Sequence, residues 1–502
     1  MFGRLRPTVC RAIPKIGRTY ATGNNSFIQS QAYINGTWLE SDSHQVFAVN
    51  NPSTSELIGE VADCDEQDFM LAAQAAHQAF REWSETSSKS RSKLLRQLAE
   101  AQMANQKELA EIITIESGKP ISEAMGEIAY GASFFDWFAD QARSAMGHIL
   151  PSPSEKTLMY IRQAAGPVGI ITPWNFPNAM ITRKLGAALA AGCTAIIKPA
   201  PDTPYSALAI AKIIDGLDIP KGVVNVLPSS VENSSKIGLH MCKAHDLRVI
   251  SFTGSSAVGK LLIQQAASTV KRVCLELGGN APFLVFDSAD LSKAVDGYIA
   301  SKFRNTGQTC VSANRCLVQA GVYDQFIDLL KTRMLEKLKT GDTLNSKTTV
   351  GALINKSAVE KVEAHVKDAL EKGAKLILGG KSTKENHFEP TLISDAKHDM
   401  LCCQEETFGP LAAIVKFNSE EEALELANSV KHGLAGYFYS QNISQIKRVS
   451  ARLEVGMVGV NEGVISTCEA PFGGVKESGL GREGGDLGIE EYQEVKYICL
   501  GS

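Results

Sequence analysis

The chain has 502 residues, of which 44% are apolar and 21% are charged, and its formal net charge at pH 7 is −4. This composition is typical of a globular protein of two or three domains, and it argues against nucleic acid as a partner. The longest apolar run falls short of the ~20 residues that a membrane span needs, which excludes an integral membrane protein.

Residues 1–20 have the composition of a mitochondrial transit peptide. Basic residues are interleaved with apolar ones, and no acidic residue precedes Glu40. The run Arg18-Thr19-Tyr20-Ala21 resembles a matrix-protease site, so we expect cleavage after Tyr20 and a protein of the mitochondrial matrix. The alternative is a disordered basic tail on a cytoplasmic protein.

Hairpin and helix patterns follow as far as Pro120. An Asn-Gly pair between apolar residues predicts a β-hairpin at residues 33–38. Apolar residues recur at alternating steps of four and three over residues 65–83, which predicts an amphipathic helix. A serine-rich break at residues 84–92 then leads into a second long helical stretch, which ends at residues 118–120.

Beyond Gly166, short apolar strands alternate with helical segments. This alternation predicts parallel sheets covered by helices, and strands on both sides of Gly278 indicate two α/β domains. A further hairpin is expected at residues 157–163, outside both domains. The expected strands span residues 168–172, 195–197, 223–227, 249–252 and 283–286.

Two glycine motifs are candidates for phosphate binding. Residues 479–484 match the G-x-G-x-x-G dinucleotide fingerprint, but no apolar strand precedes them, so we reject this loop. Residues 254–260 follow a predicted strand and match a P-loop except at Leu261, where a serine or threonine should bind magnesium. A nucleotide triphosphatase is therefore an alternative function. In either case the free amides and positive dipole of a helix N-terminus suit a pyrophosphate.

A cysteine and a glutamate are the leading candidates for the chemistry. Cys310 lies in a glycine-containing loop, 34 positions after Glu276. A thiolate attacks carbonyl carbon and a carboxylate can then activate water against the thioester, so we expect acyl chemistry. Taken alone, a free cysteine is more often a small buried apolar residue. The eleven cysteines are too sparse for a disulfide scaffold and show no metal-ligand spacing, so we expect reduced thiols and no metal.

Seven segments together resemble the aldehyde dehydrogenase superfamily, in the order of that family and from about Tyr33 to the C-terminus. The resemblance implies a Rossmann-like dinucleotide-binding domain at residues 27–146 and 165–278 and a catalytic domain at 279–477. It also implies a small β oligomerisation element at residues 147–164 and 478–502, and a homodimer or homotetramer. The segments span residues 172–177, 197–199, 252–255, 275–279, 303–310, 406–410 and 471–474.

The same resemblance implies roles for the motif residues. Cys310 is the nucleophile and Glu276 the base, and the Asn175 amide with the Cys310 backbone N–H binds the oxyanion. Many NAD-preferring relatives carry a glutamate where this chain has Pro201, so nothing at that position repels a 2′-phosphate, and we expect NADP to be accepted alongside NAD. The cofactor-binding residues are Trp174, Lys198, Gly254, Ser255, Glu406 and Phe408.

Two arginines and a serine predict the substrate class. Guanidinium groups bind carboxylates in a bidentate fork. Arg183, Arg304 and Ser466 resemble the carboxylate clamp of the relatives that oxidise succinate semialdehyde to succinate, a step of 4-aminobutyrate degradation. Glutarate semialdehyde and medium aliphatic aldehydes are the alternative substrates, because one methylene changes selectivity by only about 1–3 kcal/mol. A catalytically silent structural relative is a further alternative, against which the intact set of catalytic residues argues.

Some relatives carry a second cysteine two residues after the nucleophile, able to form a regulatory disulfide. Ser312 stands at that position in this chain, so we expect no such redox switch. Cys316 is an untested candidate for the same role.

Overall fold

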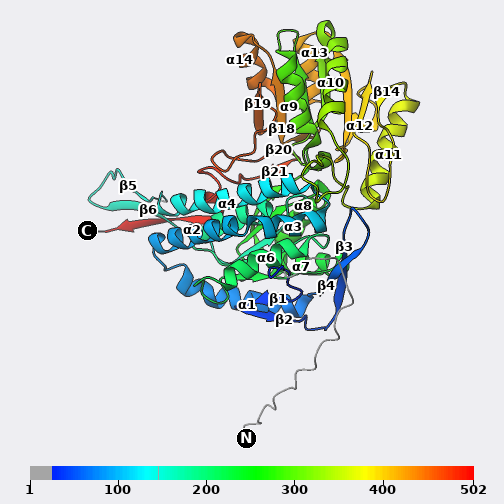
Figure 1. The fold of residues 1–502 in the computed structure, drawn as a ribbon. Helices are drawn as coiled ribbons and strands as arrows, with labels where there is room; N and C mark the ends of the chain where they lie inside the picture. Colours follow the sequence, from blue (N-terminus) through cyan, green and yellow to red (C-terminus); the bar gives the residue numbers. More distant parts are fainter. Residues whose placement is uncertain (1–24, 145, 502) are drawn as a thin grey trace.

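Two large β-sheets, each accompanied by helices, organise the chain, and a small antiparallel sheet stands apart from them (Figure 1). The computed structural model describes residues 25–144 and 146–501, so the predicted transit peptide lies outside the described residues. The predicted fold class, two α/β units with parallel sheets and a small β element, is confirmed.

The first sheet has eight strands in the order β2-β1-β9-β8-β7-β10-β11-β21. Its five central strands, in the order β9-β8-β7-β10-β11, run parallel. The alternation of strands and helices predicted four of them, but not β11. The hairpin β1–β2 is antiparallel at one edge, and β21 closes the other edge. The strands are β1 (Ala32–Ile34), β2 (Thr37–Leu39), β7 (Val168–Ile171), β8 (Ala195–Lys198), β9 (Val224–Val226), β10 (Val249–Thr253), β11 (Arg272–Glu276) and β21 (Gly479–Leu480).

The predicted second helical stretch is divided into two helices and begins earlier than expected. The Ser87 side chain accepts a hydrogen bond from Ser90 N and caps the helix, so serines assigned to the break form its first turn. Asn105 separates this helix from the next. The helices of this half are α1 (Glu66–Trp83), α2 (Ser88–Ala104), α3 (Gln106–Ser117), α4 (Ile121–Ser144), α5 (Ala179–Ala191), α6 (Pro204–Asp215), α7 (Val231–Lys243) and α8 (Ser256–Ala266).

The second sheet has seven strands in the order β14-β15-β16-β13-β12-β18-β19, parallel except at the β14–β15 edge. Its strands are β12 (Ala281–Val285), β13 (Ala313–Gln319), β14 (Lys375–Leu378), β15 (Thr391–Ser394), β16 (Leu411–Phe417), β18 (Ala435–Tyr439) and β19 (Met457–Val460). Its helices are α9 (Leu291–Phe303), α10 (Tyr323–Lys337), α11 (Lys356–Glu371), α12 (Leu401–Gln404), α13 (Glu420–Asn428) and α14 (Ile443–Arg452).

A three-stranded antiparallel sheet joins two distant parts of the chain in the order β22-β6-β5. It extends away from the rest of the ribbon on the left of Figure 1, where the chain ends. Its strands are β5 (His148–Leu150), β6 (Thr157–Ala164) and β22 (Gln493–Leu500). Two short pairs, β3 (Val46–Asn50) with β4 (Leu57–Ala62) and β17 (His432–Gly433) with β20 (Val475–Lys476), complete the described strands.

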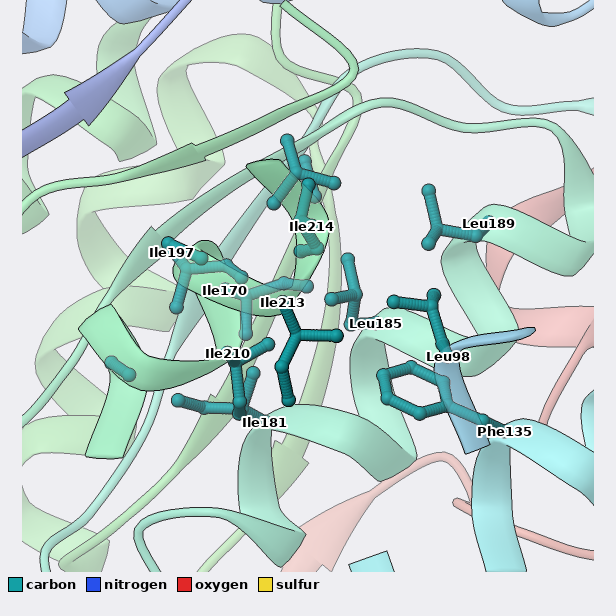
Figure 2. Close-up of a cluster of buried hydrophobic side chains, with 14 of the residues drawn as sticks. Leu98, Phe135, Ile170, Ile181, Leu185, Leu189, Ile197, Ile210, Ile213 and Ile214 are labelled. Carbon is teal, nitrogen blue, oxygen red and sulfur yellow. The ribbon is translucent and has the colours of Figure 1, made fainter. Parts of the chain in front are cut away.

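Helix α5 is held by a dense apolar core (Figure 2). Ile181, Leu185 and Leu189 of α5 pack against side chains of α2, α4, α6 and the first sheet. Each of these three α5 side chains is at most 1% exposed. Full burial of each such side chain contributes roughly 1.5–3 kcal/mol. The N-terminal half of α5 also faces the cavity described below, so this core fixes the position of one of its walls.

Candidate active site

A cavity of about 380 Å³ lies where segments from the two sheets meet. The residues that follow β7 of the first sheet line it, and so does the loop that precedes β13 of the second sheet. Two of the predicted site residues, Lys198 and Glu276, are not among its described lining residues. The other ten predicted site residues line it: Trp174, Asn175, Arg183, Gly254, Ser255, Arg304, Cys310, Glu406, Phe408 and Ser466.

The loop before Cys310 has an unusual backbone. Asn305, Thr306 and Gly307 have consecutive positive φ angles of 51°, 57° and 79°. For the two non-glycine residues this conformation costs roughly 1–2 kcal/mol each. A Cβ at Gly307 would come within 2.2 Å of Gly409 O, so only glycine fits there. Hydrogen bonds from the surroundings must therefore hold the loop in the shape that presents Cys310.

Cys310 is partly exposed and lines the cavity. Burial, together with the negative charges of Glu406 and Glu276, raises the pKa of Cys310 to about 12. Arg183 and Arg304 act in the opposite direction. In the free protein the thiol is therefore protonated at neutral pH, and it becomes a nucleophile only when a base removes its proton.

Asn175 lies against the cysteine loop. Its Nδ2 donates to Gln308 O at 3.0 Å, and its main-chain oxygen accepts from Lys119 Nζ at 2.8 Å and from Asn305 Nδ2 at 3.0 Å. An amide nitrogen carries two hydrogens, so the second hydrogen of Nδ2 is available to another acceptor. These contacts join the segment after β7 to the loop of Cys310 in one hydrogen-bonded unit.

Glu276 ends β11 and is only 1% exposed. Within the described residues, neither carboxylate oxygen has a hydrogen-bond partner. Burial and the nearby charge of Glu483 raise the pKa of Glu276 well above its usual value, which favours its neutral form. The side chain lies against Gly473, where a Cβ would come within 2.9 Å of Oε1.

Arg183 lines the cavity, and an acidic and an aromatic side chain fix its guanidinium. Its Nε lies 2.8 Å from Glu483 Oε2, and its guanidinium stacks over the Phe472 ring, 4.2 Å from the centroid. Lys184 pairs with the same carboxylate. Among the described residues, Arg183 Nη2 has no hydrogen-bond partner. A buried guanidinium with an unused donor beside a cavity is suited to bind a ligand carboxylate.

A second group of residues has the chemistry of a dinucleotide site. Ser255 caps the N-terminus of α8 by accepting from Val258 N, so the loop of Gly254 and Ser255 stands at the positive end of a helix dipole. The rings of Trp174 and Phe408 are in edge-to-face contact, with centroids 5.6 Å apart. Glu406 Oε1 accepts from Gly279 N at 3.0 Å, and burial raises the pKa of Glu406 to about 7.

Lys198 lies at the carboxyl end of β8, where parallel sheets bind ligands. Its Nζ donates to Pro199 O at 2.8 Å. Burial lowers the pKa of Lys198 to about 8, and Asp202 opposes this shift. The P-loop interpretation finds no support, because Lys260, its essential lysine, pairs with Glu477 at 2.9 Å outside the cavity.

Some lining residues were missed by the sequence reasoning. Tyr130 comes from the middle of α4, Met180 from α5 and Lys361 from α11. Each occupies a helical position with no local motif, so only the tertiary structure reveals it. Phe472, in contrast, lies within the motif at residues 471–474, although no role was assigned to it.

Ser312 and Cys316 are the two residues that bear on a possible regulatory disulfide. Ser312 Oγ donates to Lys302 O at 3.2 Å, and Cys316 is fully buried in β13. Over residues 25–144 and 146–501, no group of acidic, histidine and cysteine side chains could hold a metal ion. Nor is any helix in that part of the chain long and apolar enough to cross a membrane.

Comparisons with known proteins find a matching family and several similar proteins. The model of the aldehyde dehydrogenase family matches residues 38–498. The mitochondrial succinate-semialdehyde dehydrogenase of Homo sapiens is 50% identical over 513 residues, covering 99% of this chain and 96% of that protein. The glutarate-semialdehyde dehydrogenase of Pseudomonas putida is 49% identical over 473 residues, covering 94% of this chain and 98% of that protein. The crystal structure of an NADP-dependent enzyme from E. coli has a TM-score of 0.94 at 46% identity, covering 96% of this chain and 100% of that chain.

Proposed function

Because the chain belongs to the aldehyde dehydrogenase family, we propose that it oxidises succinate semialdehyde to succinate with NADP or NAD, through a thioester on Cys310. One observation carries the proposal: Cys310 lines the same cavity as Arg183 and Arg304. A short substrate with its aldehyde at the thiol can therefore have its distal carboxylate at the guanidinium groups. The names of the human and other mitochondrial relatives support this substrate.

The reaction begins when the Cys310 thiol loses its proton to solvent water, after which the thiolate adds to the aldehyde carbon. A C–S bond forms, and the π electrons of the carbonyl move onto its oxygen. The free hydrogen of Asn175 Nδ2 and the N–H of Cys310 are the proposed donors to this oxyanion, and one such donor contributes about 3 kcal/mol. A preorganised amide is effective here because its orientation is already fixed by Gln308 O.

When bound, the nicotinamide cofactor accepts the hydride that leaves the aldehyde carbon. The residues present fit such a group: the Gly254–Ser255 loop at the α8 N-terminus for the pyrophosphate, Trp174 and Phe408 beside the ring, and Glu406 for a ribose. Loss of hydride oxidises the carbon that Cys310 holds to the level of a thioester.

Glu276 completes the cycle as the proposed base. Its carboxylate takes a proton from water, the water oxygen attacks the thioester carbon, and the C–S bond breaks to release succinate and the Cys310 thiolate. Because burial favours the protonated form of Glu276, the carboxyl must lose its proton before it can act as a base. Its position against Gly473 places it beside the same wall of the cavity as Phe472.

NADP acceptance is part of the proposal. Pro201 follows Lys198 by three positions, so no carboxylate at that position repels a 2′-phosphate, and Lys198 attracts it. Asp202 is the acidic side chain whose charge acts on Lys198. It reduces this attraction without removing it, and we therefore expect both cofactors to be used.

Glutarate semialdehyde is a second candidate substrate, favoured by one feature of the cavity. A neighbouring cavity of about 270 Å³ shares Tyr130, Phe176, Arg304 and Ser466 with the first, so there is further open space beside Arg304 and Ser466. One more methylene can therefore be accommodated, at a selectivity cost of only about 1–3 kcal/mol. The Pseudomonas putida relative carries the name of this activity.

The cellular context and the assembly follow from separate observations. Human and Arabidopsis thaliana relatives are named as mitochondrial, which supports a mitochondrial location, and residues 1–20 predict the matrix. On the β22-β6-β5 sheet, Ile149, Val495 and Tyr497 are 77%, 62% and 59% exposed. Apolar side chains on an open sheet favour pairing with another copy, which supports a homodimer or homotetramer.

The proposed division of labour assigns residues 27–146 and 165–278 to cofactor binding and residues 279–477 to catalysis. The α8 loop in the first range and the cysteine loop in the second support this division. Residues 147–164 and 478–502 are then the oligomerisation element, supported by the pairing of β6 with β22.

A substrate panel with both cofactors tests the function. Succinate semialdehyde should give the highest kcat/KM, followed by glutarate semialdehyde, with butanal about 10-fold or more lower, because it lacks the charged hydrogen bonds to the arginines. The Cys310→Ala variant, assayed beside the wild-type protein, measures the background rate of cofactor reduction. Equal kcat/KM values for butanal and succinate semialdehyde would show that the protein does not recognise the substrate carboxylate.

A further inference from the structure

Two carboxylates in the first turns of α4 contact both halves of the candidate site. Glu123 and Glu127 stand four residues apart and therefore share one face of the helix. That face contacts Asn178, in the segment after β7, on one side and Asn305, in the loop of Cys310, on the other. Neither residue belongs to a motif, and neither takes part in the chemistry proposed above.

Glu127 has a structural role that its contacts explain fully. It pairs with the buried Lys119, and its Oε1 accepts from Asn178 N at 2.9 Å and from Ala179 N at 3.2 Å. A carboxylate in this position caps the N-terminus of α5. Glu127 thus stabilises the helix that carries Arg183.

Glu123 makes a different contact, directly in the cysteine loop. Its Oε2 accepts from Asn305 N at 2.7 Å, a short bond of the charge-assisted kind. Asn305 is the first residue of the left-handed run that leads to Cys310. Because left-handed backbone at Asn305 and Thr306 is disfavoured, an acceptor that holds the Asn305 N–H offsets part of its cost.

Glu123 also faces the proposed carboxylate site. It lines the neighbouring cavity of about 270 Å³ together with Arg304 and Ser466. Burial raises the pKa of Glu123, while the charges of Lys119 and Arg304 lower it. The interaction with Arg304 is reciprocal, so an ionised Glu123 reduces the positive potential that a substrate carboxylate meets at Arg304.

We propose that Glu123 is a positioning and specificity residue: it fixes the Cys310 loop through Asn305 N, and its charge moderates the attraction of Arg304 for substrate carboxylates. This inference rests on the proposed function for its second half only. The first half concerns the accessibility and orientation of the thiol and holds for any aldehyde. The two halves predict different effects on kcat and KM.

The experiment compares Glu123→Gln and Glu123→Ala with Asp136→Asn as the matched control. The glutamine amide oxygen keeps an acceptor for Asn305 N–H but carries no charge, whereas alanine removes both. Asp136 is an exposed carboxylate on the same helix, paired with Arg96, which also contacts Asp140. Thermal melting of each variant shows whether the fold is intact.

Two readouts separate the effects. Glu123→Ala should lower kcat with succinate semialdehyde and with butanal alike, by about 10-fold, and should change the rate at which iodoacetamide alkylates Cys310, followed by peptide mass spectrometry. Glu123→Gln should restore kcat to within about threefold and lower KM for succinate semialdehyde by about threefold, with KM for butanal unchanged. Asp136→Asn should match the wild type in every measurement.

The outcomes distinguish this inference from the proposed function. If the wild type oxidises butanal but not succinate semialdehyde, the proposed function fails, while the alkylation and butanal kcat data still test the loop. If Glu123→Ala is folded and matches the wild type in kcat and alkylation, the positioning role is wrong. An unchanged KM for the semialdehyde in Glu123→Gln, with activity otherwise intact, overturns the electrostatic role.

Discussion

At the scale of single residues, the charges around the cavity control both the ionisation of the Cys310 thiol and the proposed binding of the substrate carboxylate. Cys310 is surrounded by Glu406 and Glu276, which oppose its ionisation, and by Arg183 and Arg304, which favour it. The same arginines are the proposed anchors for the substrate. A substrate carboxylate that occupies them also weakens their support for the thiolate, so binding and nucleophile activation are coupled.

Replacing Arg304 tests the anchor most cleanly. Loss of a charged hydrogen bond costs roughly 1.5–3 kcal/mol, so Arg304→Ala should raise KM for succinate semialdehyde by about 10-fold to 100-fold. Steady-state kinetics with butanal is the internal control, because an uncharged aldehyde gains nothing from the guanidinium. A parallel rise of both KM values would show that Arg304 shapes the cavity without binding the carboxylate.

Arg183 requires a different interpretation, because it is also a structural residue. Arg183→Ala leaves Glu483 buried with Lys184 as its remaining partner, and breaking a buried pair costs roughly 3–5 kcal/mol. We therefore expect a clear loss in urea unfolding in addition to a raised KM. Arg183→Ala with unchanged stability would contradict the pairing with Glu483.

Glu276→Gln separates the two halves of the reaction. The amide cannot accept a proton, so one turnover should form reduced cofactor in a burst and steady-state kcat should then fall by about 100-fold or more. Stopped-flow absorbance measures the burst. In the wild type, thioester hydrolysis should accelerate as pH rises, because the raised pKa keeps Glu276 protonated at lower pH. A variant without a burst, slow from the first turnover, would assign Glu276 to the oxidation step instead.

Lys198 gives cofactor choice a pH dependence. Its pKa is lowered to about 8, so its ammonium is present below that value and is lost as the pH rises through it. The ratio of kcat/KM for NADP to that for NAD should therefore fall between pH 7 and pH 9, because only NADP carries the 2′-phosphate. Lys198→Met is the control and should flatten the ratio. A constant ratio in the wild type would exclude Lys198 as the phosphate partner.

Ten of the twelve site residues predicted from the sequence line the cavity, because motif residues cluster at the ends of strands and in the loops that precede or follow them. Asn175, Gly254 and Cys310 all follow this rule. Glu123 and Lys361 do not, because each is one polar position on an amphipathic helix. Whether such a side chain faces solvent or a cavity depends on how the helix packs, which the pattern of the helix alone does not contain.

At the scale of elements, the N-terminal cap of α8 should contribute both to the stability of the fold and to cofactor binding. Ser255→Ala removes the cap, which costs about 1 kcal/mol, and should also raise KM for the cofactor, since the α8 loop is then less ordered. Ser87→Ala removes the equivalent cap of α2 at a distance from the cavity. It should lower stability equally and leave cofactor KM unchanged. Equal KM effects in the two variants would disprove a specific role for the α8 loop.

The alternation of strands and helices correctly predicted four of the five parallel strands, β7 to β10, because strand β-propensity and helical periodicity agree with the final fold in that region. Strand β11 was not predicted. The prediction failed at residues 84–92, where serines were interpreted as a linker. Serine favours both loops and helix N-caps, and only the hydrogen bond from Ser90 N to Ser87 Oγ distinguishes them. Whether such a serine lies in a loop or caps a helix depends on the tertiary contacts of the apolar residues next to it.

At the scale of the whole molecule, the projecting sheet β22-β6-β5 is the proposed contact between copies of the chain. Val495 and Tyr497 stand two apart on β22 and so share one exposed face. Replacing both with aspartate should shift the protein to a smaller species in sedimentation equilibrium, because two charges in an apolar contact are strongly unfavourable. Glu494→Asp with Lys496→Arg, on the opposite face, is the control. An unchanged mass for the aspartate double variant would place the interface elsewhere.

In the proposed mechanism, Cys310 carries the oxidised acyl group during turnover. Acid quenching of Glu276→Gln during its reaction with succinate semialdehyde and cofactor, followed by peptide mass spectrometry, measures this directly. We predict one succinyl group on the peptide that contains Cys310, formed in step with the first equivalent of reduced cofactor. Reduced cofactor that accumulates while this peptide stays unmodified would contradict the mechanism.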